Sequence, residues 1–324
     1  MNRNASRAVI LAGLALALGS FVYGPTASAD TALTVGKAAA NADPIIPVNV
    51  GYQVGIFKKH GLDLKIVDFQ GGSKMVQAMT AGAIDIGDGA GTEMAFIAKG
   101  APMRAVCESA STFPFLGIGV PWDSPIKSVA DLRGKKMGIS SAGSLTDWLT
   151  KELTTKKGWG PNGLTTVAIG NGAAGIIAAF RTGVVDADIG ETALFLNMAD
   201  NKVGRLLVPV SDFEGSVASG TLYASNRLIA TNPAAVRAFI AAWLETLDYI
   251  RTHKAETVKI ESALTGNSQS VESKDYDLTL PMYTKTCKFD AEALATLKRS
   301  FVELKLLDAP PDMAKLYTEA YLQK

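Results

Sequence analysis

Two stretches of the sequence, 101 positions apart, decide the fold. They read VQAMTAGAIDIGDG at residues 76–89 and IAAFRTGVVDADIG at residues 177–190. In each stretch a helical run ends at a glycine, Gly82 or Gly183, which can adopt the left-handed conformation that terminates helices. An aspartate then opens a short apolar strand, and a glycine-rich loop follows the strand. Two such units, one in each half of the chain, predict two lobes of similar construction.

Short apolar strands alternate with amphipathic helices on both sides of these units. Strands are expected at 33–37, 62–69, 84–87, 103–109, 115–120, 136–139, 165–169, 186–189 and 205–208. Helices are expected at 74–81, 145–156, 233–250, 291–306 and 312–322. This alternation predicts an α/β fold in which mostly parallel sheets are covered by helices.

The composition excludes several function classes. The chain has 324 residues, of which 48% are hydrophobic and 19% charged, so it can form two sizeable cores. A net charge of +1 lacks the basic excess that nucleic-acid binding requires. Two histidines and two cysteines are too few for an elaborate metal site, and we expect no metal or cofactor. Cys107 and Cys287 either form a disulfide or remain two separately buried thiols.

The first 29 residues have the features of an export signal. Arg3 and Arg7 precede a short apolar run at 9–18, and Ala27-Ser28-Ala29 is a small-residue cleavage site. The apolar run is shorter than the roughly 20 residues that span a membrane. We therefore expect cleavage after Ala29 and a soluble periplasmic chain, 30–324, with a net charge of −1.

Four segments, taken in order, resemble the periplasmic substrate-binding proteins of ABC importers. They are GYQVGIFKKHGLDLKI (51–66), AMTAGAID (78–85), IKSVADLRGKKMGI (126–139) and the helical segment 232–244. The first is similar to that family's G-x-x-x-G-x-F-x-x-x-G-L entry, and the third to its S-x-x-D-L-x-G-K second-lobe opening. Within that family, the segments most resemble the nitrate/sulfonate/taurine branch, which also includes hydroxymethylpyrimidine binders.

The resemblance implies a type II periplasmic-binding-protein fold with a ligand cleft between two lobes. Lobe one is expected to comprise 30–119 and 223–324, and lobe two 120–222, with crossovers near 117–121 and 219–224. A receptor of this type binds a small polar organic solute, such as a sulfonate, a nitrate-like anion or a nitrogen heterocycle. It closes its lobes on the solute and, as a monomer, delivers it to the ABC permease subunits in the inner membrane.

Candidate ligand-binding residues lie mainly in loops after strands and at helix N-termini, where ligands bind in open α/β sheets. They are Asn41, Asp43, Ser73, Gly89, Ala90, Ser140, Ser141, Gly143, Ser144, Asn171, Glu191, Thr192 and Tyr223. Asn41 and Asp43 either contact the ligand or cap the next helix. Asn171 is either a turn residue or a ligand contact, and Tyr223 either stacks on the ligand or braces the hinge.

Two of these regions favour opposite ligand charges. The hydroxyls and free N–H groups of 140–144, at a helix N-terminus, suit an anionic head group, although plain capping explains them nearly as well. Glu191 follows the second repeat strand, where a carboxylate would accept hydrogen bonds from an amine or ring N–H. If Glu191 faces the ligand, a zwitterion or nitrogen heterocycle fits better than a bare anion. Alternatively, Glu191 is an exposed residue of a first helical turn.

Two other kinds of function remain possible from the sequence. One is a secreted enzyme on the same two-lobe scaffold, such as a small dehydratase, and the other is a ligand-presenting partner of a chemoreceptor. The chain has no G-x-S-x-G, P-loop or H-E-x-x-H motif, and His60 and His253 lie near helix ends. The fold family also includes a pyrimidine-forming synthase with a cysteine-rich active-site segment, which this sequence lacks.

Overall fold

The computed structural model describes residues 30–69, 71–140, 142, 144–170 and 172–322. The expected signal peptide, 1–29, lies outside these residues. Within the described part of the chain, no helix combines the length and apolarity needed to cross a membrane.

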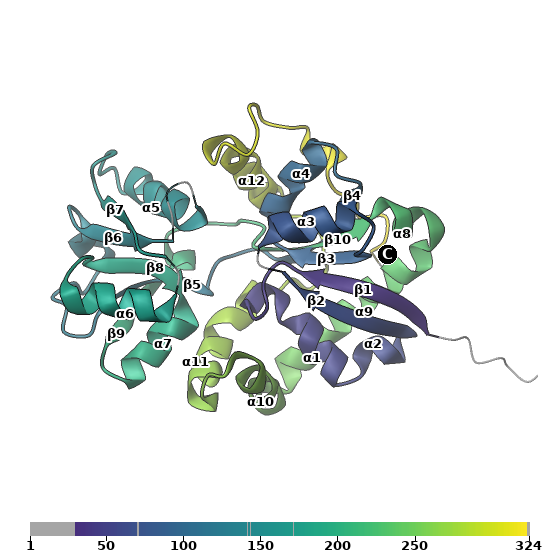
Figure 1. Ribbon diagram of the computed structural model, residues 1–324, viewed down its shortest axis with the longest axis horizontal. Coiled ribbons are helices and arrows are strands. Elements are labelled where there is room, and N and C mark those ends of the chain that lie inside the picture. Colours follow the sequence, from purple (N-terminus) through teal and green to yellow (C-terminus); the bar gives the residue numbers. More distant parts are fainter. Residues whose placement is uncertain (1–29, 70, 141, 143, 171, 323–324) are drawn as a thin grey trace, which may run out of the picture.

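Two five-stranded sheets form the centres of two lobes that lie next to each other (Figure 1). The strands of the first sheet are, in spatial order, β2 (Leu62–Asp68), β1 (Thr31–Lys37), β3 (Ile86–Gly89), β10 (Gly220–Ser225) and β4 (Met103–Ala110). Those of the second are β7 (Thr165–Ala168), β6 (Lys136–Ile139), β8 (Ala187–Glu191), β5 (Leu116–Pro121) and β9 (Gly204–Pro209). We call the layers built on these sheets the first lobe and the second lobe.

Both sheets have the same mixed arrangement. In the first sheet β1 pairs in parallel with β2 and β3, while β10 runs antiparallel between β3 and β4. In the second, β6 pairs in parallel with β7 and β8, while β5 runs antiparallel between β8 and β9. Each sheet therefore has a single reversed strand, and the expected two-lobe α/β fold with mostly parallel sheets is confirmed.

Helices cover both faces of each sheet and bury its apolar side chains. They are α1 (Pro47–Gln53), α2 (Ile56–Lys59), α3 (Gly72–Thr80), α4 (Met94–Ala98), α5 (Leu145–Lys156), α6 (Ala173–Thr182), α7 (Thr192–Asp200), α8 (Asn226–Thr231), α9 (Pro233–Thr252), α10 (Lys254–Thr265), α11 (Gln269–Thr279) and α12 (Ala291–Glu303). In the first lobe, α1, α2 and α9 pack on one face and α3, α4 and α12 on the other. In the second, α5 covers one face and α6 and α7 cover the opposite one.

The sequence repeat has the same structural basis in both lobes. Gly82 and Gly183 have φ values of 78° and 67°, the left-handed conformation that favours glycine and ends the preceding helix. The Asp85 carboxylate accepts the backbone N–H of Thr34 at 2.9 Å, and the Asp186 carboxylate accepts that of Lys136 at the same distance. Each aspartate directly precedes its own strand and thus connects the start of that strand to the neighbouring parallel strand. β3 and β8 consequently begin just after these aspartates, slightly later than expected.

The chain crosses between the two sheets twice. The expected boundary between 119 and 120 falls inside β5, and the one between 222 and 223 falls inside β10. Because β5 pairs with strands of the second sheet and β10 with strands of the first, both crossovers precede these strands. We propose segments 111–115 and 213–219 as the crossovers, so that each strand stays with its own sheet.

The C-terminal segment differs from the helix expected at 312–322. Only a short 3-10 turn, η6 (Met313–Lys315), forms there. The chain instead runs beside edge strand β4, where Ala105 N–H donates to Leu316 O at 3.2 Å and Thr318 N–H donates to Ala105 O at 2.9 Å. Hydrogen bonds to the otherwise unpaired backbone edge of β4 form here in place of the helix that the local sequence pattern predicts.

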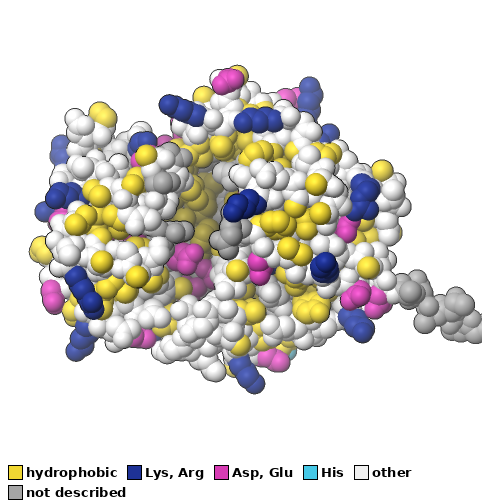
Figure 2. Space-filling view, in the orientation of Figure 1, with side chains coloured by type: hydrophobic (Ala, Val, Ile, Leu, Met, Phe, Trp, Pro, Cys, Tyr) yellow, Lys and Arg dark blue, Asp and Glu magenta, His cyan; other side chains and the backbone are white. Residues whose placement is uncertain are grey.

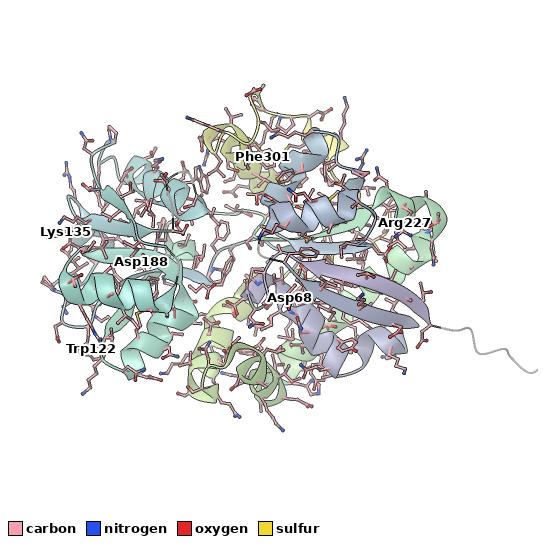
Figure 3. The ribbon with its side chains drawn as sticks, viewed as in Figure 1. Asp68, Trp122, Lys135, Asp188, Arg227 and Phe301 are labelled. Carbon is pink, nitrogen blue, oxygen red and sulfur yellow. A yellow bond between two sulfur atoms is a disulfide. The ribbon has the colours of Figure 1, made fainter. Side chains whose placement is uncertain are left out.

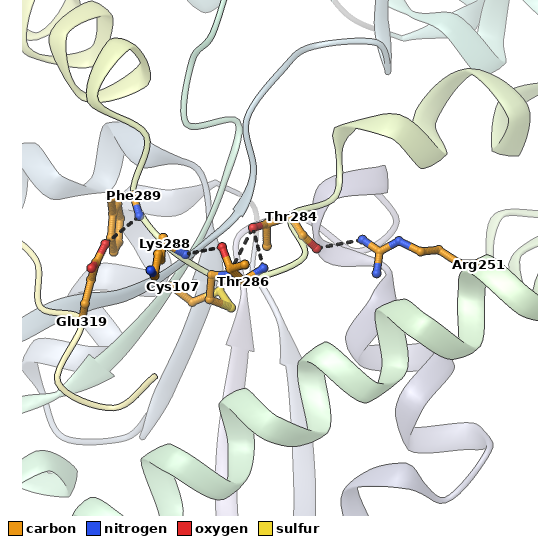
Figure 4. The surroundings of a disulfide bond; sticks show 8 residues. Cys107, Arg251, Thr284, Thr286, Lys288, Phe289 and Glu319 are labelled. Atoms are coloured by element: carbon orange, nitrogen blue, oxygen red, sulfur yellow. Dashed lines mark hydrogen bonds between the residues drawn. A yellow bond between two sulfur atoms is a disulfide. The ribbon is translucent and has the colours of Figure 1, made fainter. Parts of the chain in front are cut away.

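Cys107 and Cys287 form a disulfide that ties β4 to the loop before α12 (Figure 4). The two Cα atoms are 4.5 Å apart although 180 positions separate the residues in the sequence. Hydrogen bonds hold the same loop, since Arg251 donates to Thr284 O at 2.8 Å and Phe289 N–H donates to Glu319 at 2.9 Å. The disulfide therefore fixes the C-terminal third of the chain onto the first sheet.

Removal of this disulfide is expected to destabilise the protein. The variant C107A/C287A should lose about 2–4 kcal/mol of unfolding free energy, because the cross-link restricts a long loop in the unfolded chain. Urea denaturation of the wild type with and without a reductant measures the effect, and the double variant serves as the control that a reductant cannot change. Equal midpoints for oxidised and reduced wild type would contradict this role.

Candidate functional site

A cavity of about 280 Å³ lies between the two lobes. Figure 2 shows the molecule hollowed between the lobes, with acidic side chains gathered toward the lower end of the hollow, where Figure 1 places α11. The cavity is lined by residues of both lobes, namely Asn41, Ala42, Asp43, Phe115, Ala173, Glu191, Ala193, Leu194, Asn197, Thr265, Asn267, Glu272 and Asp275. Four of these are carboxylates, and none is lysine, arginine or histidine.

Helix α11 supplies two of the four carboxylates. Glu272 and Asp275 are three positions apart and therefore lie on one helical face. That face also carries Val271, Tyr276 and Thr279, all of which are buried. The packing of this apolar face against the first lobe takes both acids inward, leaving Glu272 3% and Asp275 1% exposed.

Short polar contacts fix the shape of this wall. The Thr265 hydroxyl donates to Glu272 Oε1 at 2.5 Å, and the Asn267 amide donates to the same oxygen at 2.9 Å. On the opposite side, the Asn41 amide donates to Leu264 O at 3.0 Å. The loop that joins α10 to α11 is thereby held against the loop that follows β1.

A buried hydrogen bond joins the acidic wall to the second lobe, and Asn197 of α7 also donates to Asn267 Oδ1 at 3.4 Å. Thr192, the first residue of α7, is fully buried, and its hydroxyl donates to Asp275 Oδ1 at 2.8 Å. Glu191 directly precedes Thr192 at the end of β8 and lies on the second-lobe side of the cavity. The carboxylates of the two lobes therefore face one cavity from opposite sides.

The crowding of carboxyl groups shifts their protonation. The pKa of Asp43 is raised well above its usual value by burial and by the charges of Asp275 and Glu261. Burial is the main cause of the raised pKa of Asp275, and it also raises that of Glu191. Burial and the charges of Glu272 and Asp275 raise the pKa of Glu261, which lies on α10 next to this group, to about 8. The ligand-free cavity therefore favours the protonated form of several of these carboxyls, and a nearby positive charge would favour their ionised form.

The chemistry of the lining suits nitrogen donors. Carboxylate oxygens accept hydrogen bonds, and the side chains of Asn41, Asn197 and Asn267 can donate and accept them. Phe115, in the first crossover, is the aromatic residue of the lining and offers a ring face. Among the described residues, no group of three or more His, Cys, Asp or Glu side chains is placed to hold a metal ion.

Three sequence-predicted residues meet at this cavity. Asn41, Asp43 and Glu191 come from different parts of the chain, and the structure brings all three into its lining. Helix capping does not account for Asn41 or Asp43, because neither side chain caps the 3-10 turn η1 (Asp43–Ile45). Their contact with a ligand stays a prediction.

The serine-rich turn before α5 lies apart from the cavity lining. The hydroxyls of Ser140 and Ser144 both contact the Thr146 hydroxyl, at 3.0 and 2.9 Å, and Asp147 N–H donates to Ser144 Oγ at 3.3 Å. These bonds match the capping interpretation, and the Asp147 carboxylate in the first helical turn pairs with Lys151 at 2.8 Å. Ser141 and Gly143 lie outside the described residues, as does Asn171.

Most of the remaining predicted residues are buried or lie elsewhere. Tyr223 is fully buried in β10 and donates its hydroxyl to Ala90 O, so it does not present its ring to a ligand. Gly89 ends β3 beside Glu93, away from the cavity lining. Ser73 lines a separate groove between α3 and α4. Thr192 touches the site only through its bond to Asp275.

Two side chains labelled in Figure 3 lie away from the cleft. Trp122 is 36% exposed and lies on the outer flank of the second lobe. Asp188 lies inside that lobe and is 1% exposed, with both carboxyl oxygens lacking a hydrogen-bond partner in the described structure. Burial raises the pKa of Asp188 to about 7.

Sequence reasoning missed the carboxylates of α10 and α11. The available signal was the position of Glu261, Glu272 and Asp275 on the apolar faces of their helices, beside Val258 and Val271. An acid on an apolar stripe is buried when the helix packs, and buried acids are uncommon without a partner. The helical pattern alone could not place that stripe against Glu191 of the other lobe.

Comparison with known proteins identifies the family. The family model described as NMT1/THI5 like matches residues 44–257, and the chain belongs to this family. A Brucella abortus (strain 2308) protein named as a binding protein is 28% identical over 249 residues, 71% of this chain and 74% of that protein. The Saccharomyces cerevisiae 4-amino-5-hydroxymethyl-2-methylpyrimidine phosphate synthase THI5 is 26% identical over 296 residues, 86% of this chain and 84% of the synthase.

A solved structure shares the two-lobe fold. The periplasmic aliphatic sulphonate binding protein SsuA from Escherichia coli superposes with a TM-score of 0.73 and 22% sequence identity. The match covers 89% of this chain and 92% of SsuA.

The variant Ser144→Ala separates capping from ligand binding. We expect it to lower the free energy of unfolding by about 1 kcal/mol, because the N-cap of α5 is lost. Urea denaturation measures this loss, and a binding titration with any solute that the protein takes up should give an unchanged affinity. Weakened binding together with unchanged stability would instead restore the anion-site interpretation.

The stability of the ligand-free protein should decrease as the pH rises. Mainly through burial, the pKa is raised to about 7 for Glu93 and to about 8 for Glu108 and Glu261. The folded state therefore binds these protons more tightly than the unfolded state. This stabilisation is complete below the unfolded pKa of about 4.3 and is lost as the pH rises through the folded values.

Thermal unfolding of ligand-free protein between about pH 5 and about pH 8.5 tests this expectation. The Tm should fall across this range, and Glu261→Gln should flatten the decrease. Glu256→Gln, on the exposed side of the same helix, is the matched control and should leave the slope unchanged. A Tm that rises with pH would refute the assignment of these carboxyls as buried groups with raised pKa values.

Proposed function

We propose that the protein is an extracytoplasmic solute receptor that captures a small polar organic molecule by lobe closure and delivers it to an ABC permease. The observation that carries this proposal is the cavity between the lobes, lined from both sides by polar side chains. Family membership, the Brucella relative and the fold shared with SsuA support it. The periplasm is the proposed compartment, in keeping with the expected signal peptide and the disulfide.

Side-chain contacts between the lobes support a movement that opens and closes the cavity. Lys274 on α11 pairs with Asp200 on α7 at 3.0 Å. At the opposite end of the cleft, the Trp148 indole N–H donates to Glu303 at 2.7 Å, and Arg299 pairs with Glu152 at 2.7 Å. The two ion pairs join partly exposed groups and are individually weak, so they can break when the lobes separate.

An enzyme on the same scaffold is the second candidate, and the match to the yeast pyrimidine phosphate synthase favours it. The cavity contains carboxyl groups of raised pKa, which could act as general acids or bases. Both cysteines, however, are joined in a disulfide remote from the cavity lining, which leaves no free thiol for chemistry. The receptor remains the function that the site supports better.

Binding without turnover distinguishes these two functions. A thermal-shift screen of sulfonates, nitrate, amino-acid-like compounds and pyrimidines should identify a solute that raises the Tm, and calorimetry should show one saturable site. Mass spectrometry of the incubated solution should recover that solute unchanged. Small-angle scattering should show a smaller radius of gyration with the solute than without it, because the lobes close.

Each readout has an outcome that contradicts the receptor. Conversion of the tightest-binding solute to a product would show that the protein is an enzyme. Saturable binding with no change in the radius of gyration would remove lobe closure from the proposal. Heat-denatured protein is the control for non-specific loss of the solute.

A further inference from the structure

We propose that the cavity selects a small organic cation whose protonated nitrogen bears hydrogen-bond donors, and that it disfavours anions such as sulfonates. This inference rests on the proposed receptor function and names the class of solute that the site takes. The cation would lie between Glu191 of the second lobe and the carboxylates of Asp43, Glu272 and Asp275 of the first.

The charge balance of the lining is one-sided. Asp43, Glu191, Glu272 and Asp275 line the cavity, and no lysine, arginine or histidine does so. None of the four forms an ion pair with a lysine, arginine or histidine of the described residues. An anion placed here would meet like charge in a poorly hydrated space, whereas a cation would supply the missing counter-charge.

The degree of burial makes this imbalance energetically significant. Glu272 and Asp275 are 3% and 1% exposed, so water screens their charges poorly. Glu261 stands next to them at 7% exposure, and its carboxyl has neither a hydrogen bond nor an ion pair among the described residues. Burying an acid without a partner is costly, and a cation bound nearby would reduce that cost.

The second lobe and the first crossover complete a site for a compact cation. Glu191 provides the carboxylate on the second-lobe side, and Asn197 provides an amide beside it. Phe115 presents an aromatic ring, whose face attracts a cation or stacks with a flat amidinium group. The cavity volume of about 280 Å³ limits the occupant to a small molecule.

Two of the four acids of the lining, and the neighbouring Glu261, lie beyond the part of the chain that the family model matches. That model ends at residue 257, whereas Glu261, Glu272 and Asp275 lie on α10 and α11. The C-terminal helices therefore supply half of the acids of the lining, and the match to the family model does not include these two residues.

Two probes that share an ethyl group but differ in charge test the inference. Ethylammonium and ethanesulfonate are titrated at equal ionic strength, with acetamidinium as a planar cation, and binding is followed by saturation-transfer NMR. We expect saturable binding of the two cations and none of ethanesulfonate. Preferential binding of ethanesulfonate, or failure of both cations to bind, would overturn the cation assignment.

Variants that replace a carboxylate with a neutral amide show which carboxylates bind the cation. Asp275→Asn keeps an oxygen that can accept the Thr192 hydroxyl, and Glu191→Gln preserves the length of the side chain. Each should weaken ethylammonium binding about tenfold or more, since hydrogen bonds to charged groups contribute about 1.5–3 kcal/mol. Asp277→Asn is the matched control on α11, because Asp277 is exposed and pairs with Lys254 outside the cavity.

The outcomes separate this inference from the receptor function. Saturable binding of ethanesulfonate without turnover would leave the receptor intact and remove only the cation assignment. Turnover of a bound cation would support the cation assignment and contradict the receptor function. If Asp275→Asn and Asp277→Asn weaken binding equally while both variants keep the wild-type Tm, the cation binds outside this cavity and the assignment is wrong.

Discussion

The structure depends on the two crossings of the chain between its sheets. β5 enters the second sheet reversed, and β10 returns reversed between β3 and the edge strand β4 of the first. Each reversed strand is hydrogen-bonded on both sides, so each sheet is completed by a strand that follows a crossing of the chain. The two lobes thus lie next to each other, and residues of both line the cavity between them. The disulfide between β4 and the C-terminal loop then attaches the last helices to the same frame.

The C-terminal helices give that shared space its charge. α10 and α11 extend from the first lobe toward α7 of the second, and the Thr192–Asp275 hydrogen bond marks their contact. Folding this arrangement without a ligand confines several carboxyls in poorly hydrated surroundings, which accounts for their raised pKa values. A cation would relieve this cost most when the lobes are closed. Ligand charge and lobe closure are therefore coupled in our account.

Local patterns in the sequence predicted the fold well, because its decisive features are local. Gly82 and Gly183 end helices by their own backbone conformation, and the two aspartates of the repeat act on neighbouring strands. The site was predicted only in part. Glu191 could be singled out at the end of a strand, but Asp275 meets it only through tertiary packing of a distant helix. The same limit explains the segment at 312–322, where pairing with β4 replaced the expected helix.

The central claim is that the cleft holds a cation. Native mass spectrometry of the protein, freshly purified under mild conditions, tests it most directly because the protein itself selects the ligand. Our account predicts a complex with one small molecule per chain, and fragmentation of that molecule should reveal a protonatable amine, amidine or ring nitrogen. A retained sulfonate or other anion without such a nitrogen would contradict it.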